Sequence, residues 1–335
     1  MAAELKPVPL VEAGELRIDQ AQAVRDACLG WLPFGGLLAR LGDPVVKRWM
    51  RRISPYAGEI DEVARSVNRS GIWLLHGAYL FGCTALADET AEGPRLRRTL
   101  DWPFPGLGRL VEVVRRRGAA GEYLNVTWPG FIGVLTAVAP GRFAASINQA
   151  PMRQRTSIHA LLWSDYVLNA LAGLRADALP PEHLLRRAFD TCTSFDEARH
   201  LLETVPVARP VLFLLVGCRS GERVIIEREG TGTRTYGDDT TLANDWQEAR
   251  SGWLPRCCGE GTPVDNNRRR RRALASWAGQ DGADKEWVAH PVLNECTRVS
   301  VEMSPATGRL VVAGWESDGR GSASRVTAVT SYVIA

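Results

Sequence analysis

A cysteine preceded by glycine and followed by threonine lies where a continuous apolar run gives way to a strand-like segment. Gly82-Cys83-Thr84 follows the apolar run Ile72–Phe81 and opens a segment that is typical of a β-strand. Glycine has no Cβ, so it tolerates the strained backbone that a scissile peptide needs. A free cysteine is otherwise most often a small buried apolar residue. Position alone therefore makes Cys83 a candidate nucleophile and nothing more.

Two charged residues follow on the second arm of the hairpin that Cys83 opens. Arg98 and Asp101 are three residues apart, so a regular strand turns them to opposite faces. Both reach Cys83 only if the strand ends or twists near Asp101, which Pro103 favours. Positive charge near a thiol favours the reactive thiolate, and a carboxylate can orient an amine. An exposed Arg–Asp pair is the alternative interpretation.

The elements that must position these residues are predicted from hydrophobic periodicity and turn residues. The pattern predicts helical structure over Gln20–Val67, interrupted at Pro33 and Pro44, and then helices over Ser157–Leu174, Glu182–Val205 and Arg270–Ala278. The predicted strands are Cys83–Asp88 and Arg97–Asp101 with the turn Ala91–Pro94 between them, and further Glu122–Thr127, Phe131–Val138, Arg142–Asn148, Val211–Val216, Arg223–Arg228, Thr231–Tyr236, Thr297–Met303, Arg309–Ala313 and Ser322–Val333. Strands and helices in alternating blocks indicate an α+β protein built in layers.

Composition narrows the class of protein. The 335 residues are 45% hydrophobic and 24% charged, with a formal charge of +3, which is typical of a globular protein. The start of the chain lacks the pattern of a secretory signal, and no apolar run reaches the roughly 18 residues of a membrane span. We therefore expect a cytoplasmic protein without stable membrane insertion. Seven scattered cysteines and five histidines predict neither disulfides nor a metal site, and no cofactor is expected.

Four stretches, in order, resemble one family of enzymes. Cys83-Thr84 through Arg98-x-x-Asp101 is similar to the nucleophile hairpin of acid ceramidase and N-acylethanolamine acid amidase, and more distantly to that of bile-salt hydrolase, penicillin V acylase and penicillin acyltransferase. The other stretches are Thr127–Thr136 with Pro140–Phe143 and Ser146–Gln149, then Ala243–Trp246 with Asp265–Arg269, and finally His290–Glu295. Each stretch is modest alone, but four in the same order are specific.

The resemblance implies a four-layer αββα sandwich of the N-terminal-nucleophile hydrolase fold, preceded by a helical segment. It also implies self-cleavage between Gly82 and Cys83, which gives a small chain 1–82, retained after cleavage, and a large chain 83–335. Cleavage frees an α-amine with a pKa of about 7.7–8.0, against about 10.4 for lysine. Such an amine can act as a base near neutral pH, so Cys83 would supply both nucleophile and base.

The resemblance also assigns roles to residues. It implies that Asp101 holds the α-amine and that Arg98 stabilises the thiolate or the substrate carbonyl. Asn244 matches an asparagine that binds the oxyanion, and Asn148 falls at another polar site position, although it could simply cap a turn. Arg268 matches a family arginine near the site, with a register that is open by one residue because five arginines are adjacent.

Three departures from the family pattern concern the substrate. The spacing from Cys83 to Arg98 is one residue shorter than in ceramidases, Asn244 and Trp246 are separated by fewer residues, and Gln149 replaces a glutamate. Trp102, Trp128 and Trp246 lie beside the motifs and could line an acyl pocket, although tryptophan is more often core.

Several other functions remain open. Water would release an acid and an amine from the acyl-enzyme, whereas a second amine would make a new amide, so an acyltransferase is the alternative to a hydrolase. A non-catalytic lipid- or ligand-binding protein whose chain stays intact is an alternative of another class. The run Arg268–Arg272 could bind nucleic acid or an anionic membrane, but no stacking aromatics interleave with it, so a solvated helix start is favoured and no nucleic-acid partner is expected.

Overall fold

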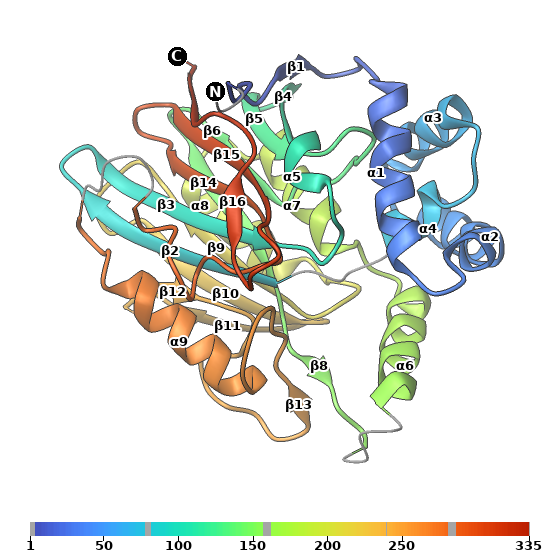
Figure 1. Cartoon of the computed structure of the whole chain (residues 1–335). Coiled ribbons are helices and arrows are strands. Elements are labelled where there is room, and N and C mark those ends of the chain that lie inside the picture. The colour runs from blue at the N-terminus through green and yellow to red at the C-terminus, as the bar shows by residue number, and fades with distance from the viewer. Residues whose placement is uncertain (1–3, 78–81, 157–161, 239, 281–285, 335) are drawn as a thin grey trace.

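Two β-sheets pack face to face at the centre of the molecule (Figure 1). The structure, a computed structural model, describes residues 4–77, 82–156, 162–238, 240–280 and 286–334. The eight-stranded sheet has the order β1 (Leu10–Glu12), β4 (Glu112–Gly118), β5 (Gly121–Thr127), β6 (Thr136–Ala139), β7 (Phe143–Gln149), β9 (Val211–Val216), β10 (Arg223–Glu229), β11 (Gly232–Tyr236). The second sheet runs β12 (Thr241–Leu242), β2 (Gly82–Thr90), β3 (Gly93–Asp101), β14 (Thr297–Ser304), β15 (Arg309–Ser317), β16 (Ala323–Arg325), and β17 (Thr330–Val333) also pairs with β15. Two short strands, β8 (Met152–Arg153) and β13 (Trp253–Leu254), pair with each other.

Helices cover the outer faces of both sheets. α7 (Pro181–Thr191) and α8 (Phe195–Thr204) pack on the eight-stranded sheet, and α9 (Pro263–Ala275) packs on β2 and β12 of the other. Strands such as β7 and β9 are buried along their whole length because one face meets the opposite sheet and the other meets helices. The four layers confirm the predicted αββα sandwich.

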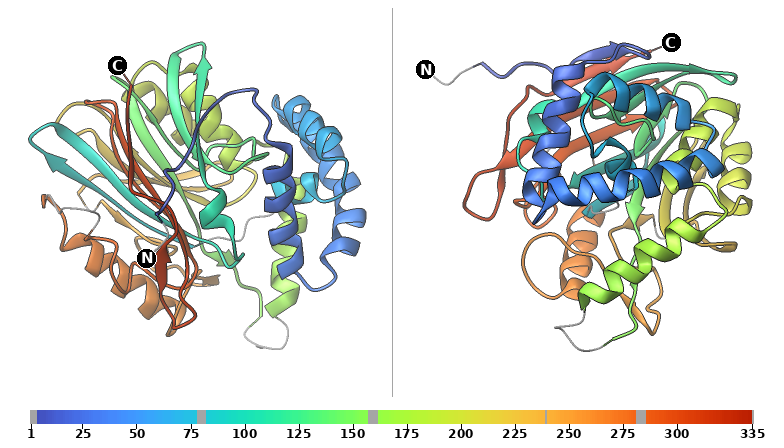
Figure 2. Two further views of the ribbon diagram at one scale, coloured as in Figure 1. Left: turned by 45° about the horizontal axis from the view of Figure 1, so that its top comes forward. Right: turned by 90° about the vertical axis from the view of Figure 1, so that its right-hand side faces the viewer.

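The N-terminal helices form a separate group at one side of the sandwich (Figures 1 and 2). This group consists of α1 (Ile18–Trp31), α2 (Gly35–Ile53), α3 (Ala57–Val67), α4 (Ile72–Gly77) and, from later in the chain, α6 (Leu162–Arg175). The short helix α5 (Leu107–Leu110) lies between this group and β15. A cluster of buried apolar residues that includes Trp49, Met50 and Ile60 holds the group together. Among the residues described, no helix is long and apolar enough to cross a membrane.

The predicted helices are correct in place but not in every boundary. Pro33 separates α1 from α2, whereas Pro44 lies inside α2 on an exposed position, where water can satisfy the carbonyl that proline leaves unpaired. The single helix predicted over residues 182–205 is two helices, because Ser194 caps α8 by accepting a hydrogen bond from the backbone of Glu197. Helix α9 begins seven residues earlier than predicted, at a cap formed by Thr262. The first five residues of the helix predicted over 157–174 lie outside the described residues.

The predicted hairpin is present, with longer arms and a two-residue turn at 91–92. The strand predicted over Phe131–Val138 is wrong in its first half, since β6 begins at Thr136. The segment predicted as a single strand over Ser322–Val333 is two short strands, β16 and β17. The arginine-rich strand β4 was not predicted, and neither was β1, which pairs with it in parallel.

Candidate active site

Cys83 lies at the start of β2, and its side chain faces the space between the two sheets. In the hairpin Cys83 is opposite Leu100, Ala85 is opposite Arg98, and Gly82 is opposite Asp101. The thiol of Cys83 lies 3.7 Å from the carbonyl oxygen of Ile147, which belongs to β7 of the other sheet. Because side chains alternate along a strand, Arg98 lies on the thiol face of the hairpin and Asp101 on the opposite face.

Arg98 contacts the thiol directly. Its Nη2 lies 2.8 Å from Cys83 Sγ and donates to Ile147 O at 2.5 Å, while Nη1 donates to Leu135 O at 2.7 Å and to the hydroxyl of Thr136. The guanidinium therefore spans from the hairpin to the opposite sheet. Burial raises the pKa of the Cys83 thiol, and the positive charge of Arg98 is the largest effect that opposes this rise.

Asp101 lies on the other side of the hairpin, beside Gly82. β3 ends at Asp101, as predicted, but the side chain still points away from the thiol and towards helix α9. Its carboxylate accepts a hydrogen bond from Thr297 Oγ1 at 2.9 Å and lies 3.3 Å from Arg270 Nη1. Burial raises the pKa of Asp101, and the charge of Arg270 opposes that rise. Asp101 is thus placed next to the Gly82–Cys83 peptide rather than next to the sulfur.

The backbone of Cys83 is held on both sides by buried side chains. Its N–H donates to Asn244 Oδ1 at 2.7 Å, and its carbonyl oxygen accepts from Arg270 Nη1 at 2.8 Å. Asn244 Nδ2 donates to the carbonyl of Gln149 at 3.0 Å, and the backbone N–H of Asn244 donates to Asn267 Oδ1 at 2.7 Å. One amide N–H of Asn244 is engaged by that carbonyl, and the second has no hydrogen-bond acceptor among the described residues.

The structure corrects the register of the expected arginine. Arg268 is exposed on α9 and lies 3.5 Å from Asp265, so it does not contact the site. Arg270, two residues further on, is fully buried there and contacts Asp101, Cys83 O and Asn244 Oδ1. The reason is helical spacing, because the buried positions of α9 recur every three to four residues and Arg268 lies on the opposite side of the helix.

Asn148 is also buried near the site. Its Nδ2 donates to the carbonyl of Ala243 at 3.0 Å, and its Oδ1 has no partner in the described part of the chain. Asn148 thus ties β7 to the residue before Asn244 and does not cap a turn.

The three tryptophans occupy different surroundings. Trp128 is buried, donates from Nε1 to Leu107 O at 2.8 Å, and packs 4.6 Å from the ring of Trp102. Trp246 is buried against Trp253 and lines a cavity of about 390 Å³ that it shares with Arg268. Trp102 and Trp128 therefore form a packed aromatic pair, and Trp246 lies beside α9 in the wall of a separate cavity.

Gly82 is required for a reason that differs from the one predicted. Its φ angle lies outside the left-handed region, so the backbone there is not one that only glycine adopts. A Cβ at this position would instead lie 2.5 Å from Cys258 Sγ and 3.4 Å from Asp101 Cβ. The glycine is therefore explained by the close approach of the Cys258 thiol.

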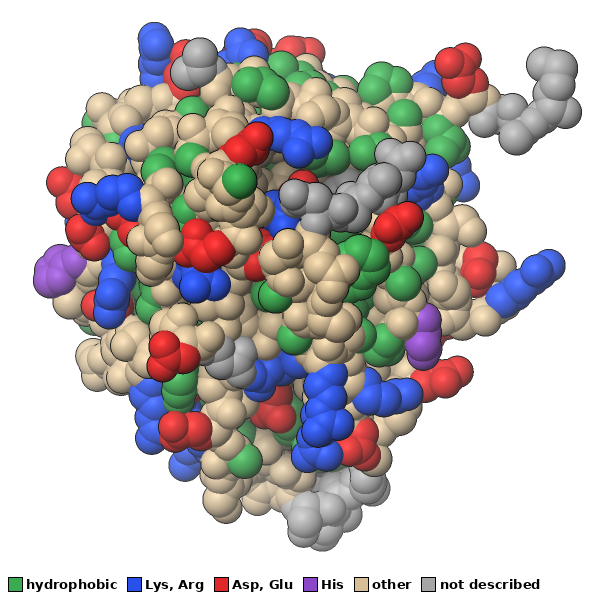
Figure 3. All heavy atoms as spheres, turned by 90° about the vertical axis from the view of Figure 1, so that its left-hand side faces the viewer, with side chains coloured by type: hydrophobic (Ala, Val, Ile, Leu, Met, Phe, Trp, Pro, Cys, Tyr) green, Lys and Arg blue, Asp and Glu red, His purple; other side chains and the backbone are tan. Residues whose placement is uncertain are grey.

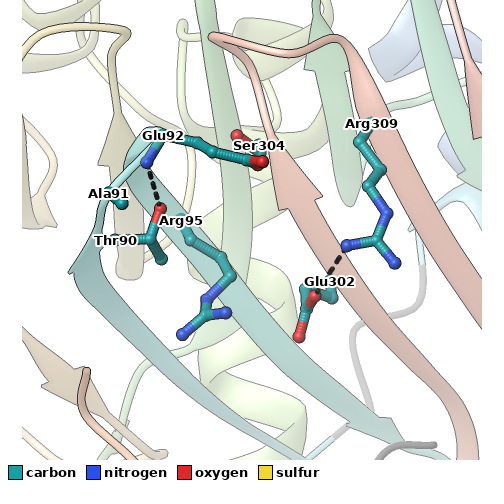
Figure 4. Close-up of a pocket in the computed structure, with 7 residues that line it drawn as sticks. All are labelled: Thr90, Ala91, Glu92, Arg95, Glu302, Ser304 and Arg309. Carbon is teal, nitrogen blue, oxygen red and sulfur yellow. Dashed lines mark hydrogen bonds and ion pairs between the residues drawn. The ribbon is translucent and has the colours of Figure 1, made fainter. Parts of the chain in front are cut away.

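The Cys83 side chain is fully buried. A cavity of about 210 Å³ lies at the other end of the same hairpin, lined by Thr90, Glu92, Arg95, Glu302 and Arg309 among others (Figure 4). Thr90 is seven residues from Cys83, or roughly 23 Å along a strand, so that cavity is not part of the site.

Comparison with known proteins agrees with this geometry. No family model matches the chain. The N-acylethanolamine-hydrolyzing acid amidase of Mus musculus is 24% identical over 309 residues, covering 87% of this chain and 79% of that enzyme. The acid ceramidase of Mus musculus is 34% identical over 100 residues, which is 30% of this chain and 23% of that enzyme.

A solved structure shows the fold. The Caenorhabditis elegans ortholog of N-acylethanolamine-hydrolyzing acid amidase superposes with a TM-score of 0.50 at 18% identity, covering 67% of this chain and 93% of that one. The chain is therefore similar to an N-acylethanolamine-hydrolyzing acid amidase along most of its length and to an acid ceramidase over about a third of it, and it shares the fold of the Caenorhabditis elegans ortholog.

Proposed function

We propose that this chain hydrolyses the amide bond of N-acylated amines through a thioester on Cys83, after the peptide between Gly82 and Cys83 has been cut. One observation carries the proposal. The thiol of Cys83 lies 2.8 Å from Arg98 Nη2, while the backbone nitrogen of the same residue lies 2.7 Å from Asn244 Oδ1. Cleavage would turn that nitrogen into an α-amine beside its own thiol.

Self-cleavage would use the thiol of Cys83 on the peptide bond that precedes it. The sulfur attacks the carbonyl carbon of Gly82, an S–C bond forms as the C–N bond breaks, and the released nitrogen takes the thiol proton. Water then hydrolyses the thioester, which leaves a carboxylate on Gly82 and a free thiol and amine on Cys83. Asp101 and Arg270, which lie beside this peptide, would hold the α-amine and the Cys83 carbonyl.

Turnover would use the same groups. The α-amine accepts the thiol proton, and the thiolate attacks the acyl carbonyl of the substrate. The remaining N–H of Asn244 and the guanidinium of Arg98 would stabilise the oxyanion, and loss of one such donor typically costs about 2.7–4 kcal/mol of barrier. The protonated amine passes its proton to the leaving amine, and water then releases the carboxylic acid.

Retention of segment 1–82 is part of the proposal. The segment is held by contacts that cleavage does not remove. Arg186 pairs with Glu59 at 2.6 Å, Tyr56 donates to Asp190 at 2.9 Å, and the backbone N–H of Ile132 donates to the ring of His76 at 3.1 Å. Strand β1 also pairs with β4. Co-elution of both pieces in gel filtration would test this.

The substrate class is inferred from the relatives. Their names describe hydrolysis of N-acylethanolamines and of ceramide, so a fatty acyl amide is the first substrate to test, followed by an N-acyl amino acid. The two relatives compared above are hydrolases, so transfer to an amine acceptor is not favoured. Feeding a substrate with and without a competing amine separates the two reactions by their products.

Intact mass with N-terminal sequencing tests the proposal. We expect two chains for the parent, the larger beginning at Cys83, and release of fatty acid from N-palmitoylethanolamine or ceramide. Cys83→Ala should give one inactive chain, whereas Cys218→Ala, which changes a cysteine outside the site, should behave as the parent. A parent chain that stays intact and releases no acid from any of these amides would overturn the proposal.

A further inference from the structure

Two cysteine thiols that the proposed mechanism does not use lie near the Gly82 end of the nucleophile hairpin. Cys258 is in the loop before α9, and its Sγ would lie 2.5 Å from a Cβ at position 82. Cys296 is the last residue before β14, and its carbonyl oxygen accepts a hydrogen bond from the backbone N–H of Trp102 at 2.6 Å. Trp102 follows Asp101, which is opposite Gly82 in the hairpin, so both loops reach the same end of the hairpin.

The two loops are in contact with each other. A Cβ at Gly259 would lie 3.4 Å from the Cβ of Asn294, and the thiols of Cys258 and Cys296 are joined by a hydrogen bond. This hydrogen bond lowers the pKa of the Cys296 thiol and, together with burial, raises the pKa of the Cys258 thiol. Cys296 therefore ionises first, and Cys258 is the donor. Such a pair combines an attacking thiolate with a neighbouring thiol that can close a disulfide.

These two thiols are more accessible than that of the proposed nucleophile. Cys258 and Cys296 are half-buried, whereas Cys83 is fully buried and its side chain is on the opposite face of the hairpin. Cys28 and Cys192 are buried, and burial raises the pKa of both thiols. Acidic and basic side chains are interspersed over the face shown in Figure 3, so no field of one sign there selects a charged oxidant. A small uncharged oxidant, a hydroperoxide, is the class that fits half-buried thiols.

We propose that Cys258 and Cys296 form a redox-sensitive modification site that a hydroperoxide converts to a disulfide. With hydrogen peroxide, the Cys296 thiolate attacks one oxygen, the O–O bond breaks, and the other oxygen leaves as hydroxide, which takes up the proton that Cys296 had lost. The Cys258 sulfur then attacks the sulfenic sulfur, and the S–S bond forms as the S–O bond breaks. The departing hydroxide takes the Cys258 proton. Two electrons thus pass from the sulfurs to the peroxide, two waters form, and a thiol reductant reverses the change.

The disulfide would fasten the segment that carries Arg270 to the sheet. Residues 259–295, between the two cysteines, include α9, and Arg270 of α9 donates to the carbonyl oxygen of Cys83 and contacts Asp101. Closing a loop of this length restricts the unfolded chain, so oxidation should stabilise the folded one. Both cysteines follow position 83, so the bond forms within one piece whether or not the chain is cut, and it does not depend on catalysis by Cys83.

Mass mapping of the whole protein tests the proposal. Protein freed of reductant is treated with about one equivalent of hydrogen peroxide, alkylated under denaturing conditions and digested without reduction. We expect a cross-linked pair of peptides that is two hydrogen atoms lighter than the sum of its parts, with the bond assigned by fragmentation to Cys258 and Cys296. A thiol reductant should separate the pair. The guanidinium unfolding midpoint should rise on oxidation and return on reduction.

Cys257 supplies the matched control, because it precedes Cys258 directly and is also half-buried. Cys257→Ser should keep the cross-link and the redox-dependent midpoint, whereas Cys258→Ser and Cys296→Ser should each lower the cross-linked fraction by about tenfold or more. Circular dichroism of the reduced variants checks their folding, and fragmentation of the parent peptides assigns the bond without any variant. A parent in which Cys258 and Cys296 stay separately alkylated while peroxide oxidises Cys218, or in which the bond joins Cys257 instead, would refute the site.

Discussion

Replacing Arg270 with methionine removes the cation at the centre of the proposed site. Its guanidinium contacts six partners, which are Cys83 O, Thr84 Oγ1, Asp101, Asn244, Asn266 and Asn267. Arg270 and Asp101 are both fully buried, and removing one partner of a buried ion pair costs about 3–5 kcal/mol because the other charge stays buried. The pKa of Asp101 should rise further without Arg270, so the carboxyl takes up a proton. Since Thr297 remains as a partner, we expect a loss near the lower end of that range.

The adjacent arginines supply the comparison. Arg268→Met breaks a pair between two side chains that are 57% and 59% exposed, so it should cost under about 0.5 kcal/mol. Guanidinium unfolding, with both substitutions placed in a Cys83→Ala background, measures each loss on a single chain. Adding Asp101→Asn to Arg270→Met should cost less than the sum of the separate effects. An Arg270→Met protein that is no less stable than Arg268→Met would contradict a stabilising role for the buried pair.

Three further predictions concern the Cys83 thiol, the Gly82–Cys83 peptide and the buried His76. Arg98→Met removes the charge that opposes the burial-raised pKa of the Cys83 thiol, so the pH–activity profile should move to higher pH, whereas an unmoved profile would deny that role to Arg98. Gly82→Ala should slow cleavage of the chain, because the added Cβ would lie 2.5 Å from Cys258 Sγ, and adding Cys258→Ala should restore the rate. Gels of freshly purified protein measure the cleaved fraction, and a double variant that is still slow would point to another cause. Burial lowers the pKa of His76 from 6.5 to about 4 in the folded chain. Between these two pH values His76 is protonated in the unfolded chain but neutral in the folded one, so the free energy of unfolding should fall by roughly 3 kcal/mol as the pH drops from above 6.5 to 4. His76→Gln should flatten that part of a curve of unfolding free energy against pH, and an unchanged slope would count against it.

Hydrophobic pattern predicted most of the sandwich because its strands are short, buried and bounded by turn residues. The prediction was wrong where a polar side chain sets the end of a helix. Ser194 caps α8, so the stretch predicted as one helix is two. The prediction also failed at β4, whose arginines hide the alternation of the strand. In both places polar residues, rather than the spacing of apolar ones, determine the element, and hydrophobic periodicity does not register them.

The error of two residues at Arg268 has a different origin and a detectable signal. The sequence prediction began the helix at Arg270, which left the arginine run without a helical face. Beginning at the cap Thr262 places Asn266, Arg270 and Leu274 four residues apart, so one arginine of the run must turn inwards with them. Arg98 could be found from the hairpin alone because its contact with Cys83 is local. Arg270 lies 169 residues after Asp101, on a helix that packs against the hairpin. Its spacing from Asn266 and Leu274 along α9, rather than its distance from a motif, is therefore the signal that would have identified it.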